Sequence, residues 1–319
     1  MHVPLTKTFH QPVLLEAVLE IFHQLPAGSV FLDATTGAGG HTEALLDVLP
    51  ESVKVIAVDK DLEAISIAKR NLERYKARIS FVHNDFKNQF FQLTGPVAGI
   101  LIDLGVSSMM LDNPERGFSF SQNGPLDMRM DQSGGETAAD LLNRLSYEEL
   151  RKTLWEYGQE RFSSRIARKI VASRKTNPIL TTGQLEEIIF RAIPAKHRPS
   201  KIHPATRSFM AIRIAVNQEL QGLNAALERG VDLLQAGGRM AVISFHSLED
   251  RIVKQTFAGL VRGCICPPRD PVCRCHRQPK VKRRTPITAS KEEVKENNRA
   301  RSARLRAVQR LPAERSDRE

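Results

Sequence analysis

The sequence predicts an α/β protein in which an open parallel sheet is interrupted by a helical insertion. Three observations support this fold class. Short apolar runs alternate with helix-like segments over residues 1–104, and a glycine-rich turn at 36–40 follows the first of these runs. After a long stretch without strand patterns, an apolar run at 239–245 resumes the alternation. Such alternation is typical of a parallel sheet covered by helices.

Local patterns predict the individual elements of the first domain. Buried-strand patterns occur at 30–33, 54–59, 79–83 and 98–104. Helical periodicity predicts helices at 41–49 and in the segment that Asp61 caps.

The segment that interrupts the sheet has the sequence patterns of helices. Helices are predicted at 137–145, 146–158, 160–174 and 182–193. One long helix is expected over 205–234. We therefore expect a discontinuous domain formed by 1–107 and 211–300, an inserted helical domain at 108–210, and a basic tail at 301–319.

The composition is that of an ordinary folded protein, with 41% hydrophobic and 26% charged residues. No apolar run approaches the roughly 18 residues that a membrane span needs, and the amino-terminal segment lacks a secretory signal pattern. All four cysteines fall at 264–275, whereas a disulfide scaffold would scatter them. We therefore expect a cytoplasmic protein.

The charge distribution indicates a polyanionic partner. The net charge is +11, yet residues 161–213 carry 12 Lys and Arg against 2 Asp and Glu, and residues 262–319 carry 17 against 7. Two basic zones are thus joined to an acidic body, which favours nucleic-acid binding. A solvated helix face and a solubilising tail are the alternatives.

The glycine-rich turn and the strand ends predict a ligand site. Gly37, Gly39 and Gly40 lie between a strand and a helix, where backbone N–H groups can face a ligand. A dinucleotide fingerprint would need a third glycine where Thr42 stands. Asp59 ends the second strand, where a carboxylate can accept both hydroxyls of a ribose.

Acidic residues recur at the ends of the predicted strands. Asp33, Asp59 and Asp103 each end a strand, and His246 follows the last one. Because ligands bind outside the carboxyl ends of parallel strands, we expect these residues to converge on one crevice.

Long strings of this chain resemble the bacterial 16S ribosomal RNA cytosine-N4 methyltransferase family. The resemblance covers about residues 8–255 and resumes at 298–303. Its strings are HQPVLLEAV (10–18), DATTGAGGHT (33–42), DLGVSS (103–108), RGFSF (116–120), GPLDMRMD (124–131), IHPATRSFMAIRIAVNQEL (202–220) and GGRMAVISFHSLEDRIVK (237–254).

The resemblance implies a Rossmann-like S-adenosylmethionine-dependent methyltransferase domain with an inserted helical domain. It places Gly39, Gly40 and His41 along the methionine end of the cofactor. Asp59 would hold the ribose, Phe86 would pack near the adenine, and Asp103 would lie by the reacting region. Where the family commonly has Gln, this chain has Met110, which cannot make the polar cofactor contact that a Gln could. A second such departure, Met210, is consistent with repacking.

The chemistry implied is methylation of the N4 amine of a cytosine in the decoding region. That amine is a poor nucleophile, so the enzyme must place it in line and accept its proton. Our hypothesis gives this role to Asp103 with the backbone at Ser107 and Ser108, and names His246 as a second candidate. The alternative for His246 is a structural histidine that orients the turn at 244–249.

Recognition of 16S rRNA, within the small ribosomal subunit, is assigned to the basic zones. Arg161, Arg207 and Arg213 are the candidate RNA-binding residues, and the target base must be presented unstacked. The sequence leaves open whether the chain acts as a homodimer.

The cysteines have the spacing C-x-C-x6-C-x-C. Four thiolates this close could surround one Zn²⁺, but C-x-x-C is the commoner spacing. Similar segments occur in the resembled family outside catalysis. The sequence alone therefore assigns no metal.

Three other functions remain as alternatives. A DNA amino-methyltransferase is opposed by the missing Pro-Pro-Tyr signature, and a nicotinamide-dependent oxidoreductase by Thr42. A non-enzymatic RNA-binding or assembly factor with a vestigial pocket is supported by Met110 alone.

Overall fold

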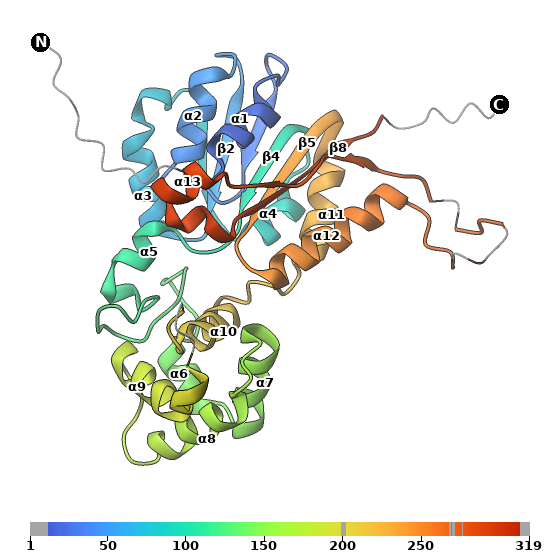
Figure 1. Ribbon diagram of the computed structural model, residues 1–319. Coiled ribbons are helices and arrows are strands. Elements are labelled where there is room, and N and C mark those ends of the chain that lie inside the picture. Colours follow the sequence, from blue (N-terminus) through green and yellow to red (C-terminus); the bar gives the residue numbers. More distant parts are fainter. Residues whose placement is uncertain (1–11, 199–201, 268, 270–271, 276, 313–319) are drawn as a thin grey trace, which may run out of the picture. The chain divides into compact units, whose positions relative to one another are not determined.

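The computed structural model describes residues 12–198, 202–267, 269, 272–275 and 277–312. Over these ranges the chain forms two compact units (Figure 1). Unit 1 takes the residues up to 105 and those from 222 onward, and unit 2 is Val106–Gln221. The expected boundaries, 107/108 and 210/211, lie close to the first junction and eleven residues before the second. Residues 1–11, where the segment examined for a secretory signal begins, lie outside the described ranges.

Unit 1 is built on one mixed sheet, which has eight strands within the described residues. The strands are β1 (Val30–Asp33), β2 (Lys54–Asp59), β3 (Ile79–His83), β4 (Val97–Asp103), β5 (Leu234–Ser244), β6 (Val281–Arg283), β7 (Ile287–Thr288) and β8 (Arg304–Arg310). Their order is β3-β2-β1-β4-β5-β8-β6, and β7 also pairs with β8. The pairings among β1 to β5 are parallel, whereas β8 runs antiparallel to β5.

Helices of unit 1 cover the sheet, and the strand side chains alternate between two hydrophobic cores. The helices are α1 (Leu15–Phe22), α2 (Gly40–Val48), α3 (Leu62–Asn71), α4 (Phe86–Gln92), α11 (Leu223–Leu233), α12 (Ser247–Arg262) and α13 (Lys291–Glu296). Leu101 packs in the core that α1 and α2 share, and its neighbours Ile100 and Ile102 pack in the core of α11 and α12. Burial of both faces explains why the central strands read as continuous apolar runs.

Unit 2 has a hydrophobic core of its own. Its helices are α5 (Ser108–Asp112), α6 (Ala138–Arg144), α7 (Tyr147–Gly158), α8 (Ser163–Arg174), α9 (Thr182–Ala192) and α10 (Thr206–Asn217). Capping boxes at Thr137, Ser146 and Thr181 begin α6, α7 and α9. Gly158 lets α10 approach α7 closely, because a Cβ there would lie 2.7 Å from the carbonyl oxygen of Arg207.

Two expectations about secondary structure are corrected by the structure. The segment at 205–234, expected as one helix, forms α10 and α11, because Gln218 (φ 48°) and Gly222 (φ 72°) adopt left-handed conformations between them. The expected basic tail contains β8, which lies inside the sheet between β5 and β6. Arginines alternate with apolar residues in Arg304–Arg310, so the basic composition hid a strand pattern. Residues 313–319 lie outside the described ranges.

Across the part of the chain that the structure describes, no helix combines the length and the apolar character needed to cross a membrane.

Candidate active site

Three aspartates end three neighbouring parallel strands of unit 1. Asp33 is the last residue of β1, Asp59 of β2 and Asp103 of β4, and β1 lies between the other two strands. Asp33 pairs with Ala57 and Leu101, so β2 and β4 each continue two residues beyond it. The strand order reverses between β1 and β4, and open α/β sheets bind ligands outside the strand ends at such a point. The aspartates expected to converge therefore share one edge of the sheet.

The glycine-rich turn follows β1, which is the shortest of the three strands. Gly37 (φ 54°) and Gly39 (φ 91°) have left-handed conformations, and the N–H of Gly39 donates to the carbonyl of Thr36 at 2.9 Å. Gly39 is the N-cap of α2, and a Cβ there would lie 2.7 Å from Leu72 Cδ1. A Cβ at Gly37 would meet no atom within 4 Å, so the turn presents open backbone beside the strand ends.

Asp59 fixes this turn to the end of β2. Its Oδ2 accepts a hydrogen bond from the N–H of Gly37 at 2.7 Å, and its Oδ1 accepts one from the N–H of Asp61 at 2.9 Å. Burial raises the pKa of this carboxyl, although both hydrogen bonds oppose the rise. Each oxygen keeps a second lone pair, so the carboxylate can still accept bonds from ligand hydroxyls.

Asp33 is the most deeply buried of the three, at 1% exposure. Its Oδ2 accepts a hydrogen bond from the Thr42 hydroxyl at 2.5 Å, and its Oδ1 accepts a longer one from the N–H of Thr35 at 3.3 Å. Burial raises the pKa of Asp33 to about 6 despite these donors. Asp33 therefore links the glycine-rich turn to the first turn of α2 through these two hydrogen bonds.

Asp103 differs from the other two because one of its oxygens lacks a donor. Its N–H donates to the Thr35 hydroxyl at 2.6 Å, and its Oδ2 lies 3.7 Å from Nδ1 of His41. Its Oδ1 is buried and has no hydrogen-bond partner among the described residues. Burial raises the pKa of Asp103 well above its usual value, and the charges of Asp33 and Glu249 raise it further. The raised pKa makes this carboxyl a stronger proton acceptor than an ordinary aspartate.

His41 faces Asp103 in its neutral form. Its Nε2 lies 3.0 Å from the carbonyl oxygen of Val13, which can only accept, so Nε2 carries the proton. Burial lowers the pKa of His41 to about 4, so the ring has no charge at neutral pH. The side of the ring toward Asp103 thus offers a lone pair and leaves the Asp103 carboxyl without a donor.

His246 lies at the start of α12, after β5. Its Nδ1 accepts a hydrogen bond from the N–H of Glu249 at 3.4 Å, and its Nε2 lies 3.1 Å from Glu249 Oε1. The Glu249 carboxylate in turn accepts a bond from the N–H of Phe245 at 3.0 Å. The bond from Glu249 N–H to His246 Nδ1 and the reciprocal bond from His246 N–H to Glu249 Oε2, at 3.3 Å, form a capping box, which favours the structural alternative. A catalytic part for His246 stays a prediction.

Of three further predicted residues, Phe86 follows the carboxyl end of β3, whereas Ser107 and Met110 belong to unit 2. Phe86 begins α4, is partly buried, and packs against Phe90 with ring centroids 5.6 Å apart. Ser107 caps α5 by accepting a hydrogen bond from the N–H of Met110 at 3.3 Å. Met110 is 4% exposed and packs in the core of unit 2, so apolar packing accounts for a methionine at this position. Cofactor contacts by Phe86 and Met110, and a catalytic part for Ser107, stay predictions.

The predicted RNA-binding arginines also lie in unit 2 and differ in their surroundings. Arg161 and Arg207 are exposed. Arg213 makes a two-pronged ion pair with Glu219, with both N–O distances at 2.8 Å, and its side chain is only 16% exposed. Arg213 therefore has a structural partner, and an RNA contact by any of the three stays a prediction.

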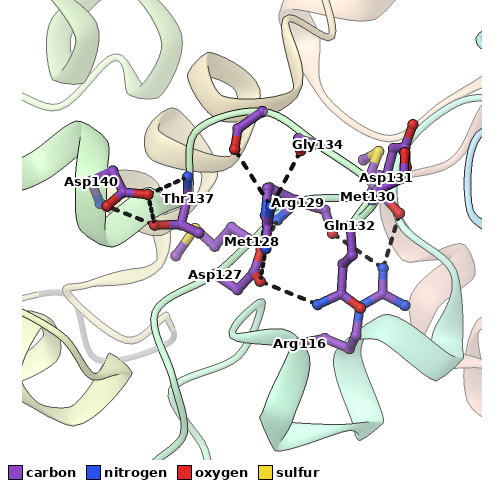
Figure 2. A network of polar contacts seen from close by, with 12 residues as sticks. Arg116, Asp127, Met128, Arg129, Met130, Asp131, Gln132, Gly134, Thr137 and Asp140 are labelled. Atoms are coloured by element: carbon purple, nitrogen blue, oxygen red, sulfur yellow. Dashed lines mark hydrogen bonds and ion pairs between the residues drawn. The ribbon is translucent and has the colours of Figure 1, made fainter.

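A polar network in unit 2 holds the loop that carries the GPLDMRMD string (Figure 2). Asp127 accepts two hydrogen bonds from the Arg129 guanidinium, each of 2.8 Å. Buried Arg116 donates to the carbonyls of Arg129 and Met130 at 3.1 and 3.0 Å. Met128, between them, has a left-handed conformation (φ 61°). These bonds satisfy the backbone of a loop without regular structure.

Sequence reasoning missed the two threonines that position the carboxylates. The Thr35 hydroxyl accepts a hydrogen bond from the N–H of Asp103, and the Thr42 hydroxyl donates one to the Asp33 carboxylate. Thr42 was considered only as a missing glycine. Its place in the first turn of the helix after a strand-end aspartate was the available signal.

Comparisons with known proteins agree over nearly the whole chain. The model of the MraW methylase family matches residues 7–311. Three relatives are named "Ribosomal RNA small subunit methyltransferase H". The protein from Syntrophotalea carbinolica is 49% identical over 95% of this chain and 98% of its own, and that from Heliobacterium modesticaldum is 47% identical over the same shares. The protein from Thermomicrobium roseum is 48% identical over 97% of this chain and 95% of its own. The chain belongs to the MraW methylase family.

Proposed function

We propose that this protein is an S-adenosylmethionine-dependent methyltransferase that methylates the exocyclic N4 amine of a cytosine in 16S ribosomal RNA. The observation that carries the proposal is the edge of the unit 1 sheet. There an open glycine turn, a carboxylate that can accept ribose hydroxyls, and a carboxyl with a free buried oxygen lie on adjacent strands. Family membership and the names of the relatives support the choice of rRNA.

The residues present fit S-adenosylmethionine. The open backbone at Gly37 suits the close approach of a ligand, whereas Leu72 and Pro12 fill the space where a Cβ of Gly39 and of Gly40 would lie, so cofactor contacts by these two glycines rest on the family resemblance. Asp59 suits the ribose, because it has lone pairs left after fixing the turn. When bound, this cofactor supplies a methyl group that its sulfonium already activates.

The task of the protein is then to orient the amine and take its proton. The N4 amine loses a proton as its new bond to carbon forms, and the free Oδ1 of Asp103 is the acceptor that we assign to it. The raised pKa of Asp103 matches this carboxyl to a weakly acidic N–H group. His41 donates no hydrogen bond to Asp103, because its proton lies on Nε2 and bonds to the Val13 carbonyl oxygen. Ser107 and Ser108 are assigned as further positioning groups.

RNA binding is assigned to the exposed cations of unit 2 and to the basic carboxyl-terminal segment. Arg165, Arg168 and Lys169 are exposed on α8, opposite buried Ile166 and Ile170. Phosphate contacts from such a face supply affinity that falls with salt, and the target base must leave its stack to react. We place the reaction in the cytoplasm on the small ribosomal subunit, where free cysteines also persist.

The alternative of a non-enzymatic assembly factor loses its support. It depended on Met110, and the core packing of that side chain explains the residue without a degenerate pocket.

Transfer of a labelled methyl group tests the proposal. The protein would be incubated with tritiated cofactor and one acceptor in each reaction. The acceptors are small ribosomal subunits, free 16S rRNA, double-stranded DNA and ribosomal protein. We expect label in the rRNA, recovered as N4-methylcytidine after digestion to nucleosides. Label in DNA or protein, in another nucleoside, or in no acceptor would contradict the proposal.

A further inference from the structure

A cluster of cysteines lies in the segment between α12 and β6, apart from the strand ends that form the candidate active site. Cys264, Cys266, Cys273 and Cys275 form no disulfide. Their four Sγ atoms all lie within 4.8 Å of one another. Sulfur atoms gathered this closely without disulfide bonds between them call for a physical explanation.

Three of the sulfur atoms form a nearly equilateral triangle. The distances are 3.5 Å from Cys264 to Cys273, 3.6 Å from Cys273 to Cys275, and 3.6 Å from Cys275 to Cys264. A disulfide would need about 2.0 Å. A tetrahedral zinc site with Zn–S bonds of about 2.3 Å has S–S edges of about 3.8 Å. The triangle therefore has the size of one face of a tetrathiolate site, and Cys266 supplies a fourth sulfur.

Backbone donors hold the two C-x-C arms of the cluster together. The N–H of Ile265, between the first two cysteines, lies 3.4 Å from the sulfur of Cys275. The N–H of Arg274, between the last two, lies 3.3 Å from the sulfur of Cys266. Each arm thus donates to a sulfur of the other. Such bonds favour thiolates and orient them as metal ligands.

The cluster has little hydrophobic support. Ile265 is 59% exposed and Val272 is 68% exposed, so the apolar side chains beside the cysteines point largely to solvent. A segment without a core of its own needs a disulfide or a metal to hold one conformation. The sulfur distances exclude the disulfide.

We propose that Cys264, Cys266, Cys273 and Cys275 bind one structural Zn²⁺ ion. Soft thiolates in a tetrahedral arrangement select zinc, and four protein ligands leave no open position for catalysis. The ion would tie the end of α12 at Arg262 to the chain that leads into β6, which pairs with β8. A zinc tetrathiolate carries two negative charges, and Arg262, Arg274 and Arg277 in the same segment provide compensating cations.

Metal analysis of the full-length purified protein tests this proposal. We expect about one zinc per chain by mass spectrometry of the wild type after removal of loosely bound metal. Cys266→Ser and Cys273→Ser should retain less than about a tenth of that content. The matched control is Val272→Ser, which changes an exposed residue of the same segment that offers no ligand and should keep its zinc.

Two further readouts keep the proposal falsifiable if a variant folds poorly. Cobalt exchanged into the wild type should give the visible bands of a tetrahedral tetrathiolate, and a chelator should lower the melting temperature of the wild type but not of Cys266→Ser. A wild type that is folded and zinc-free, that holds iron in place of zinc, or that contains cysteine disulfides would overturn the assignment. None of these readouts depends on methyl transfer, so this proposal and the proposed function can fail separately.

Discussion

At the scale of single residues, the three strand-end aspartates have different partners. Asp33 and Asp59 each accept hydrogen bonds at both oxygens, and these bonds build the turn. Asp103 keeps a buried Oδ1 without a donor. Leaving such a group unsatisfied costs about 1–3 kcal/mol, a cost that native proteins tolerate mainly at functional positions. This contrast with Asp33 and Asp59 is the reason that we propose Asp103 as the proton acceptor.

Asp103→Asn should remove proton acceptance while keeping the size of the side chain. We expect the single-turnover rate of methyl transfer to fall by about a hundredfold or more, because an amide is not a general base. The affinity for the cofactor should change less than the rate. Rapid-quench assays with saturating cofactor would measure this, and a rate within a few-fold of the wild type would contradict the role of Asp103.

Asp33 should make stability depend on pH in a defined window. Its pKa is about 6 in the folded protein against 3.8 when unperturbed, so between these values the folded state binds more protons. Stability therefore falls as pH rises from about 4 to 6, by at most about 3 kcal/mol. Asp33→Asn lacks this titration.

The free energy of unfolding of the wild type minus that of Asp33→Asn isolates the effect. Urea unfolding at a series of pH values should show this difference falling between pH 4 and 6 and constant above pH 7. A flat difference, or one that rises with pH, would show that Asp33 is not buried as the structure has it.

Sequence could predict where these aspartates lie but not how they differ. Each ends an apolar run, and that pattern is enough to place Asp33, Asp59 and Asp103 at one sheet edge. Which oxygen lacks a donor depends on the positions of Thr35, Thr42 and the Val13 carbonyl. Those positions follow from turn geometry and from a contact 28 residues apart, which no local pattern encodes.

At the scale of elements, the start of α12 explains why His246 stands after β5. Its ring and the Glu249 carboxylate satisfy N–H groups that the first turn of a helix leaves without partners. A histidine in this place keeps α12 aligned with the end of β5. The cap accounts for Nδ1, whereas the buried Nε2 has no hydrogen-bond partner among the described residues, so a catalytic part for His246 stays a prediction.

His246→Ala should therefore act on stability. We expect a loss of about 1 kcal/mol, the usual cost of removing a helix cap, with turnover per folded molecule within a few-fold of the wild type. Ser290→Ala, which removes the cap of α13, is the matched control. Thermal melts and single-turnover assays on both variants would decide. A rate loss for His246→Ala as large as that of Asp103→Asn would place the histidine in the chemistry.

The break between α10 and α11, at 218–222, is a feature that the sequence pattern does not predict. Apolar residues run through 205–234 at helical spacing, so periodicity alone joined α10 to α11. The break depends on Gln218, a non-glycine residue in a left-handed conformation, and Gly222. A single glycine within a helical pattern is a weak breaker, and the conformation of Gln218 has no sequence signal.

At the scale of the whole molecule, β8 completes the sheet of unit 1. It covers the edge of β5, and Leu305, Ala307 and Val308 are buried. Asp250 on α12 accepts hydrogen bonds from Arg306 at 2.6 and 3.1 Å, and joins the strand to the helix. Composition suggested a tail because it averaged these apolar residues with the arginines around them.

Deletion of residues 304–319 should destabilise the fold. The burial of three apolar side chains, worth about 5 kcal/mol, is lost, and the edge of β5 becomes open to pairing with other chains. We expect aggregated protein or a melting temperature far below that of the wild type. Deletion of 313–319 alone leaves β8 and every contact among the described residues in place and serves as the control. A chain lacking 304–319 that melts like the wild type would contradict the position of β8.

The insertion has a clear signal in the sequence, and the structure has two compact units. The end of strand patterns after residue 104 and their return near 239 mark the insertion, and the separate core of unit 2 follows from its amphipathic helices. The sequence predicts the second boundary at 210/211, eleven residues before the end of unit 2 at Gln221. The reason is that α10 packs on α7 of unit 2, a tertiary contact that periodicity cannot reveal.

The most direct test of the central claim is calorimetric titration of S-adenosylhomocysteine into the wild type and Asp59→Ala. If the strand-end carboxylates and the glycine turn form the donor site, the wild type should bind one equivalent. Asp59→Ala should bind at least about tenfold more weakly, because the ribose acceptor and the anchor of Gly37 are both lost. Asp47→Asn, which alters an exposed ion pair with Arg74, should bind as the wild type does. Equal affinity in Asp59→Ala and the wild type, or no binding to the wild type, would contradict the account.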